Sequence, residues 1–179
     1  MVLKKTPVCE FDLPAVQFSL PGVDGKTWSL KEVKGSKGLL VMFICNHCPY
    51  VKAIRERLVC DAKEIQQLGI GCVAICANDA SDYPEDSFEN MQKIAKAWQL
   101  PFPYLQDEAQ EVAKAYDAVC TPDFFGYNKD LKLQYRGRID ELLGAMTIIA
   151  ETGKGPLNQI PSMGCSIKWR PFAASDSII

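Results

Sequence analysis

The chain has 179 residues, 47% of them hydrophobic, and its 20 Lys and Arg are balanced by 22 Asp and Glu for a formal net charge of −2. This length suits one sizeable core, so we expect a single domain over residues 1–179. The charge balance supplies no basic surface for nucleic acid, and no apolar run has the length of a signal peptide or membrane span. We therefore expect a cytoplasmic protein with neither a nucleic-acid nor a membrane partner.

The first half of the chain alternates strand and helix patterns. Residues 16–30 alternate apolar and polar side chains around Asp24-Gly25, which predicts an N-terminal β-hairpin. Residues 38–45 and 70–77 are nearly uncharged apolar runs, typical of strands buried on both faces. Between them, residues 48–68 repeat apolar side chains every three or four positions, which predicts an amphipathic helix.

The second half continues this alternation and then changes. A helical pattern follows Asp86 or Ser87, either of which can cap it. The later elements are predicted at 102–105 (strand), 108–116 (helix), 124–128 and 133–139 (a second hairpin) and 141–152 (helix). Prolines and glycines cluster near both ends, which we expect to wrap around the middle. The whole order predicts an α/β fold with a central mixed β-sheet flanked by helices on both faces.

The stretch FICNHCPYVK, residues 43–52, joins the first buried strand to the long helix. Ligand chemistry in such sheets gathers at the carboxyl ends of strands, where Cys45 lies. Unpaired N–H groups at a helix start lower the pKa of a cysteine, so we expect Cys45 to be an exposed nucleophile. Cys48, one turn further on, is expected to be the less accessible thiol that resolves it as a disulfide. Protonated His47 would favour the Cys45 thiolate and make the pair more oxidising.

Two alternatives compete with this interpretation. Eight cysteines in one chain make a chance Cys-x-x-Cys pair easy to obtain, and Cys45 and Cys48 with a third ligand also suit zinc or copper(I). The position of the pair, after a buried strand and at the start of a helix, favours redox chemistry. His47 is the only histidine and is adjacent to Cys48, which makes joint ligation of one ion awkward. We expect neither a metal nor a cofactor.

These residues resemble the thioredoxin-like superfamily, in particular its branch of alkyl hydroperoxide reductases and thiol-specific antioxidants, over roughly residues 10–172. FICNHCPYVK is similar to the redox motif of that family, and TPDFF to the segment that carries its cis-proline. YRGRID and PSMGCSIKWRP resemble motifs of bacterial probable thiol-disulfide isomerases or thioredoxins. The resemblance implies a thioredoxin-like fold with an inserted βα unit, and a site tuned by Asn46, His47, Thr121 and Pro122, with the Thr121-Pro122 bond cis and facing the disulfide.

The resemblance also implies thiol-disulfide exchange with a protein or small-molecule disulfide, followed by re-reduction by a partner. A thiol peroxidase of the peroxiredoxin type, using Cys48, is the alternative. Peroxiredoxins carry a threonine three residues before their reactive cysteine, where this chain has Cys45. They also place a positive charge near the thiolate, which Arg136 or Arg138 would have to supply here. The buried acid of thioredoxins is missing from GLLVMF, and Asp79 is a candidate substitute.

The remaining cysteines divide into two groups. Cys120 adjoins the proposed cis-proline and Cys165 lies in the C-terminal segment, so either could reach the redox pair as an additional thiol. Cys72 and Cys76 share a strand, where they are expected to be buried small hydrophobes. Cys60 falls opposite the apolar stripe of its helix and is expected to be an exposed spectator.

Overall fold

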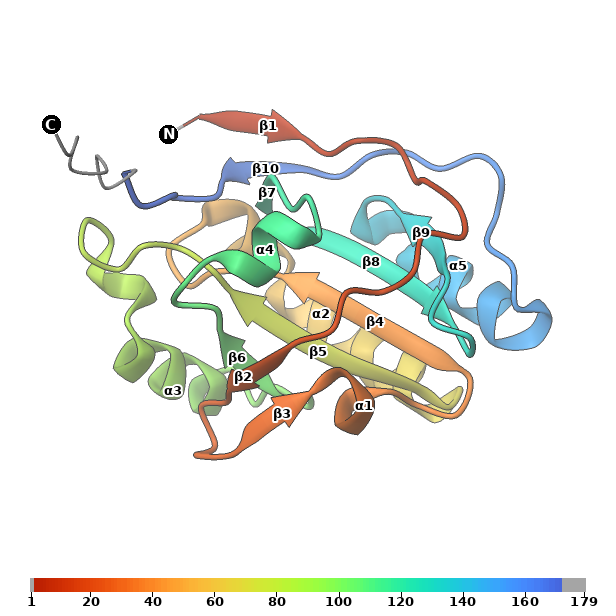
Figure 1. Cartoon of the computed structure of the whole chain (residues 1–179), viewed down its shortest axis with the longest axis horizontal. Coiled ribbons are helices and arrows are strands. Elements are labelled where there is room, and N and C mark those ends of the chain that lie inside the picture. The colour runs from red at the N-terminus through yellow and green to blue at the C-terminus, as the bar shows by residue number, and fades with distance from the viewer. Residues whose placement is uncertain (1, 172–179) are drawn as a thin grey trace, which may run out of the picture.

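The computed structural model describes residues 2–171, and its centre is a mixed five-stranded sheet in the order β6-β5-β4-β8-β9 (Figure 1). The strands are β4 (Gly38–Phe43), β5 (Ile70–Cys76), β6 (Tyr104–Gln106), β8 (Asp123–Asn128) and β9 (Leu133–Arg136). The first three run parallel to one another, whereas β8 is antiparallel to both β4 and β9. This is the predicted mixed sheet, and the structure has the thioredoxin-like fold.

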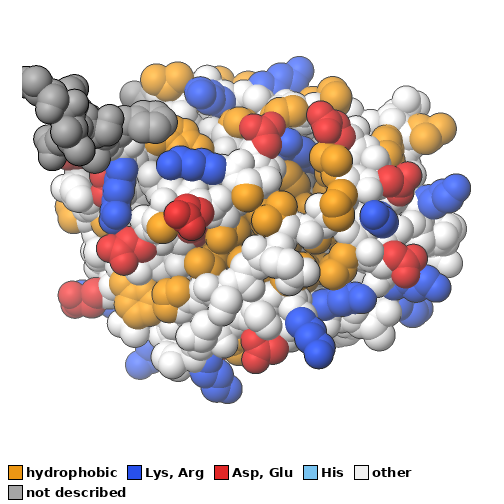
Figure 2. All heavy atoms as spheres, in the orientation of Figure 1, with side chains coloured by type: hydrophobic (Ala, Val, Ile, Leu, Met, Phe, Trp, Pro, Cys, Tyr) orange, Lys and Arg blue, Asp and Glu red, His pale blue; other side chains and the backbone are white. Residues whose placement is uncertain are grey.

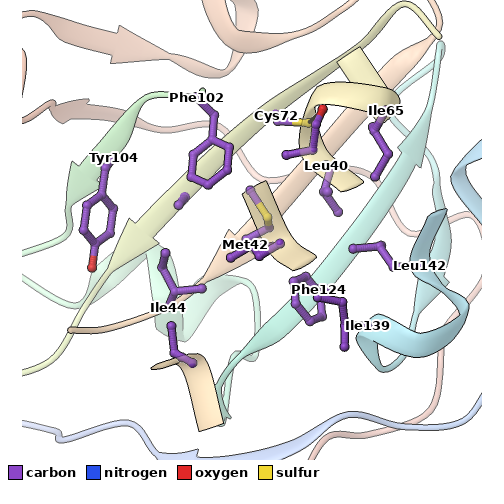
Figure 3. Close-up of a cluster of buried hydrophobic side chains, with 14 of the residues drawn as sticks. Leu40, Met42, Ile44, Ile65, Cys72, Phe102, Tyr104, Phe124, Ile139 and Leu142 are labelled. Atoms are coloured by element: carbon purple, nitrogen blue, oxygen red, sulfur yellow. Dashed lines mark hydrogen bonds between the residues drawn. The ribbon is translucent and has the colours of Figure 1, made fainter. Parts of the chain in front are cut away.

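Helices cover both faces of this sheet. The helices are α1 (Leu30–Val33), α2 (Pro49–Gln67), α3 (Phe88–Ala97), α4 (Glu111–Ala115) and α5 (Ile139–Thr152). Leu40 and Met42 of β4 point into the core shared with α2, α3 and α5 (Figure 3), whereas Leu39 and Val41 point into the core shared with α1 and α4. Alternate side chains of β4 thus enter two separate cores, which explains why its sequence is apolar at every position.

The local signals that define the element ends are largely confirmed. β2 (Ser19–Pro21) and β3 (Thr27–Ser29) form the N-terminal hairpin, with Gly25 at a φ of 83° in its turn. Ser87 caps α3 by accepting a hydrogen bond from the Asn90 N–H. Asp86 instead ends a short 3₁₀ helix (Pro84–Asp86) and is available for another role.

A second, three-stranded sheet was not predicted. It consists of β1 (Leu3–Lys5), β10 (Met163–Ser166) and β7 (Cys120–Thr121), in the order β1-β10-β7. These strands have two to four residues each, too few to show an alternating pattern. They bring segments near both ends of the chain together beside β7, as Figure 1 shows, and residues 172–179, which the expected wrapping included, lie outside the described residues.

One surface hollow is lined by residues of the N-terminal segment, α4, β8 and β9. Hydrophobic side chains gather around a hollow on the face shown in Figure 2, where a cavity of about 110 Å³ lies between the N-terminal segment and α4. Tyr116, Phe125 and Tyr127 line it. Within residues 2–171, no helix combines the length and the apolar character needed to cross a bilayer.

Candidate active site

Cys45 and Cys48 lie where β4 gives way to α2, as the sequence indicated. β4 ends at Phe43, and Cys48 is the N-cap residue of α2, followed by Pro49 at the first helical position. Cys45 therefore lies in the loop, and the thiol at the positive end of the helix is Cys48. This differs from the expectation that Cys45 would occupy the helix start.

Both thiols are closed off from solvent. Cys45 is 1% exposed and Cys48 is 0% exposed, so the prediction of an exposed Cys45 is wrong. The Thr121 hydroxyl lies 3.3 Å from the Cys45 sulphur, and His47, which contacts the same sulphur at 3.8 Å, stacks on the ring of Tyr83. Segments remote in sequence thus close over the loop, a contact that a motif read in isolation does not reveal.

The Cys48 sulphur makes several polar contacts. Its S–H donates to the Thr121 carbonyl oxygen at 3.3 Å and to the Cys165 sulphur at 2.9 Å, and the Cys45 thiol interacts with it as well. The Val51 backbone N–H adds a favourable interaction, although Cys48 makes no full N-cap hydrogen bond. Cys48 is therefore the central sulphur of a group of three.

This arrangement decides which thiol ionises first. The hydrogen bond from Cys45, aided by Cys165, outweighs burial and lowers the pKa of Cys48 to about 4. Donation of the same hydrogen bond, then burial and the charge of Asp86, raises the pKa of Cys45. The lowered pKa thus belongs to Cys48, which corrects the expectation of a lowered pKa at Cys45.

His47 is held by a carboxylate that sequence reasoning considered only as a helix cap. The ring Nδ1 lies 2.5 Å from Oδ2 of Asp86, which is 1% exposed. Asp86 also accepts hydrogen bonds from the backbone N–H groups of Asn46 and His47 and from the side-chain amide of Asn78. Four donors therefore converge on one buried carboxylate and fix the loop that carries Cys45.

Asn46 ties the same loop to two further elements. Its side-chain amide donates to the Glu85 carbonyl at 2.8 Å, and its Oδ1 accepts from the Tyr104 hydroxyl at 3.0 Å. Asn46 is 3% exposed, which places it inside the site. Asp79, the expected substitute acid, instead accepts from the Ser81 N–H and lies 3.6 Å from Arg170. The acid beside Cys45 and His47 is Asp86, and only its proximity in the fold reveals it.

Thr121 contacts both thiols, and its bond to Pro122 has the expected cis geometry. The Thr121-Pro122 peptide bond is cis, and Thr121 contacts Cys45 through its hydroxyl and Cys48 through its carbonyl. The Pro122 carbonyl accepts a hydrogen bond from the Ser162 hydroxyl at 2.9 Å. A groove of about 380 Å³ adjoins this corner and is lined by Pro122, by Tyr50 after the motif and by Met163 of β10.

The other cysteines differ in their relation to the site. Cys165 contacts Cys48, whereas Cys120 lies in β7, which pairs with the strand of Cys165, and contacts the Pro122 carbonyl at 3.8 Å. Burial raises the pKa of Cys72 and of Cys76 to about 12, so both are the inert, buried residues that were expected. Cys60 is exposed on α2, as predicted.

The arginines proposed for a peroxidase are occupied elsewhere. Arg136 is 5% exposed and binds the buried carboxylate of Asp123 at 2.9 Å. Arg138 pairs with Glu141 at 2.7 Å. Arg136 thus neutralises Asp123, whose pKa burial raises to about 6, and its charge is committed to that pair.

A metal ion would find a different ligand group from the one expected. Ligand atoms of Cys45, His47 and Asp86 lie within 4.8 Å of one another, and Cys48 is not part of this group. His47 Nδ1 and Asp86 Oδ2 are 2.5 Å apart, closer than the roughly 3.3 Å between two ligands of a tetrahedral zinc ion. These two atoms form a direct hydrogen bond, so binding an ion would require them to separate.

A thioredoxin-like fold with a dithiol at a helix N-terminus beside a cis-proline defines a thiol-based redox protein. The comparison with family models agrees, because the AhpC/TSA family model matches residues 12–137. The chain belongs to the AhpC/TSA family. Members of this family act on thiol, disulfide or peroxide substrates.

Solved structures share the fold of this chain. An uncharacterized conserved protein from Geobacillus kaustophilus is 44% identical, with a TM-score of 0.92 over 97% of this chain and 99% of that one. A hypothetical protein from Sinorhizobium meliloti 1021 is 37% identical, with a TM-score of 0.89 over 93% and 98%. A thiol:disulfide interchange protein from Chlorobium tepidum, 19% identical with a TM-score of 0.64 over 78% and 96%, shares the fold. No curated protein matches the chain.

Proposed function

We propose that this chain is a thiol-disulfide oxidoreductase that acts through Cys45 and Cys48. The observation that carries the proposal is the placement of the pair, with Cys48 at the N-terminus of α2 and Thr121 of the cis-proline turn contacting both sulphurs. Two thiols so placed can alternate between dithiol and disulfide without a cofactor.

In the first step, Cys45 attacks a substrate disulfide. Its proton passes to the Cys48 thiolate, to which it is already hydrogen-bonded, while a mixed disulfide forms and one substrate thiolate leaves. Cys48 thereby serves as the proton acceptor that no acidic side chain of β4 supplies. In the second step, Cys48 gives that proton to the departing substrate sulphur and attacks the Cys45 sulphur, which leaves a Cys45–Cys48 disulfide and a second substrate thiol.

His47 and Asp86 act as positioning residues in this scheme. The Asp86 carboxylate orients the imidazole so that Nδ1 lies between the carboxylate and the Cys45 sulphur, at 2.5 and 3.8 Å. A positive imidazole there stabilises negative charge on Cys45 when it becomes the leaving group during re-reduction. The groove beside Pro122 is where we place the substrate, because it is the hollow that adjoins the turn touching both thiols.

The test is reduction of insulin disulfides by the purified protein with dithiothreitol as the electron source. We expect Cys45→Ser to lose the catalysed rate. Cys60→Ser, which replaces an exposed thiol with no part in the proposed mechanism, should retain it. An unchanged rate in Cys45→Ser would overturn the proposal. Accumulation of a mixed disulfide on Cys48→Ser would in addition identify Cys45 as the attacking sulphur.

Peroxidase activity at Cys48 is the second candidate, favoured by two observations. The pKa of Cys48 is lowered to about 4, and its closed surroundings admit a hydroperoxide more readily than a protein disulfide. The thiolate would attack a peroxide oxygen, and Cys45 would condense with the resulting sulfenic acid and release water. If hydrogen peroxide oxidises Cys48 no faster than it oxidises the exposed thiol of Cys60, this candidate is excluded.

A further inference from the structure

Three sulphur atoms, not two, form the centre of the site. Cys165 lies in β10, 117 positions after Cys48 in the sequence, and the two sulphurs are 2.9 Å apart. That separation is well below ordinary non-bonded contact, and the covalent bond they would form measures about 2.05 Å. Only a small movement separates this pair from a disulfide.

The backbone fixes Cys165 in this position. Cys165 pairs with Thr121 in the β7–β10 ladder, and Thr121 itself contacts the Cys48 sulphur through its carbonyl oxygen. At the neighbouring Gly164, an added Cβ would overlap the Thr121 carbonyl oxygen, so only glycine permits so close an approach of the two strands. The cis-proline turn is therefore the common support of both thiols.

We propose that Cys165 is a third redox thiol. Once the Cys45–Cys48 disulfide has formed, Cys165 replaces Cys45 as the disulfide partner of Cys48. The inference rests on the proposed function, which supplies that disulfide. Cys165 attacks the Cys48 sulphur, the Cys48–Cys165 bond forms, and the Cys45–Cys48 bond breaks. Cys45 leaves as a thiolate and takes the proton that Cys165 gives up, so the exchange needs neither an oxidant nor a reductant.

The electrostatic surroundings favour the exchange only after oxidation. In the dithiol, burial and then the hydrogen bond to the Cys48 thiolate raise the pKa of Cys165 to about 12. Formation of the Cys45–Cys48 disulfide removes the negative charge of Cys48 and with it that hydrogen bond. The favourable influence of Lys168 on Cys165 remains. Cys165 thus becomes easier to ionise at the step in which it must attack.

The exchange changes what the oxidised protein can do. With the disulfide between Cys48 and Cys165, Cys45 is again a thiol beside His47 and Thr121. It can attack a second substrate disulfide, giving its proton to the substrate sulphur that leaves, while Cys48 is unable to resolve the adduct. Such an adduct persists long enough for another substrate thiol to displace Cys45, which is the requirement for isomerisation rather than net reduction.

The test is disulfide mapping after oxidation of the reduced, full-length protein with one equivalent of diamide, which accepts two electrons and two protons. Acid quenching stops exchange, denaturing alkylation marks the free thiols, and peptide mass spectrometry identifies the bonds. We expect Cys45→Ser to form the Cys48–Cys165 disulfide. In the wild type, we expect the fraction of free Cys45 to be roughly tenfold higher than in Cys165→Ser. Cys120→Ser, a neighbouring buried thiol, is the matched control and should behave as the wild type.

The outcomes separate this inference from the proposed function. If Cys165→Ser still forms the Cys45–Cys48 disulfide but Cys45→Ser forms no bond between Cys48 and Cys165, the redox role of Cys165 is refuted. The proposed function then stands. Equal, low fractions of free Cys45 in the wild type and in Cys165→Ser refute the exchange. If no Cys45–Cys48 disulfide appears in Cys165→Ser, the proposed function fails. Cys165→Ala, checked by circular dichroism, repeats the test should the serine variant not fold.

Discussion

Cys48 has a different role at the residue scale from that of an ordinary buried cysteine. Burial alone raises the pKa of a thiol, as it does for Cys72 in the same core. At Cys48, the interactions with Cys45 and Cys165 outweigh burial. The polar contacts of a buried sulphur, and not its depth alone, therefore determine whether it is reactive.

This difference predicts an acid-side titration in the reduced protein. The ultraviolet absorbance of thiolate should persist at neutral pH and disappear with a midpoint near pH 4, and Cys48→Ser should lack this transition. Because the folded pKa lies below the unfolded value of about 8.5, Cys48 contributes stability above that value and loses it as the pH falls towards 4. The difference in unfolding free energy between wild type and Cys48→Ser should shrink over that range in urea titrations. A pH-independent difference would show that Cys48 is a neutral thiol.

Asp86 offers a second prediction at this scale. Asp86→Ala leaves four donors without their acceptor, including the Nδ1 of His47, and should destabilise the reduced protein by about 2–4 kcal/mol. Asp82→Ala, at an exposed position just before the 3₁₀ helix that ends at Asp86, should change the unfolding free energy by less than about 0.5 kcal/mol. Urea denaturation of the two variants side by side measures the difference. Equal stabilities would mean that the Asp86 network does not hold the loop.

At the scale of elements, strand β10 positions a reactive side chain by its register. Its pairing with β7 places Cys165 opposite Thr121 and, on the other side, opposite Leu3 of β1. A slip of one residue would point the thiol to the opposite face of this small sheet. Gly164 helps to fix the register because it lets β10 lie directly against the Thr121 backbone.

Gly164→Ala should therefore disturb both stability and chemistry. The new Cβ pushes β10 away from β7, which we expect to cost about 1–3 kcal/mol and to reduce Cys48–Cys165 disulfide formation after diamide treatment. Gly144→Ala is the matched control, because Gly144 is exposed in α5 with no neighbour within 4 Å of the added carbon. That variant should be stabilised by up to about 1 kcal/mol. If Gly164→Ala is as stable as the control, the close approach of the strands is not required.

The sequence predicted the larger elements because their signals are local. β4 and β5 are continuous apolar runs, and α2 repeats its apolar stripe over about five turns. The local pattern of each segment therefore predicts whether it is a strand or a helix. β7 and β10 carry no such signal, since their pairing depends on a partner more than 40 positions away. For the same reason the Cys45–Cys48 pair was predictable, whereas Asp86 beside His47 and the contact between Cys48 and Cys165 depend on the tertiary fold.

On the scale of the whole molecule, the central sheet and the small β1-β10-β7 sheet have different roles. The central sheet and its helices build two cores and present the loop of Cys45 and Cys48 at the end of β4. The small sheet ties both ends of the chain to the cis-proline turn and closes the site from the other side. The site therefore lies at the junction between the two parts, and its integrity depends on both.

The position of the disulfide determines how strongly the molecule is cross-linked. A bond between Cys45 and Cys48 closes a loop of four residues, but a bond between Cys48 and Cys165, 117 positions apart, encloses most of the chain. In the chain-entropy treatment, a loop of about 100 residues stabilises a protein by roughly 4.7 kcal/mol and a short one by much less. The free energy of unfolding, measured by urea denaturation, should therefore be several kcal/mol higher for oxidised Cys45→Ser than for oxidised Cys165→Ser. Exchange of the disulfide among three sulphurs would thus change the unfolding free energy of the entire fold.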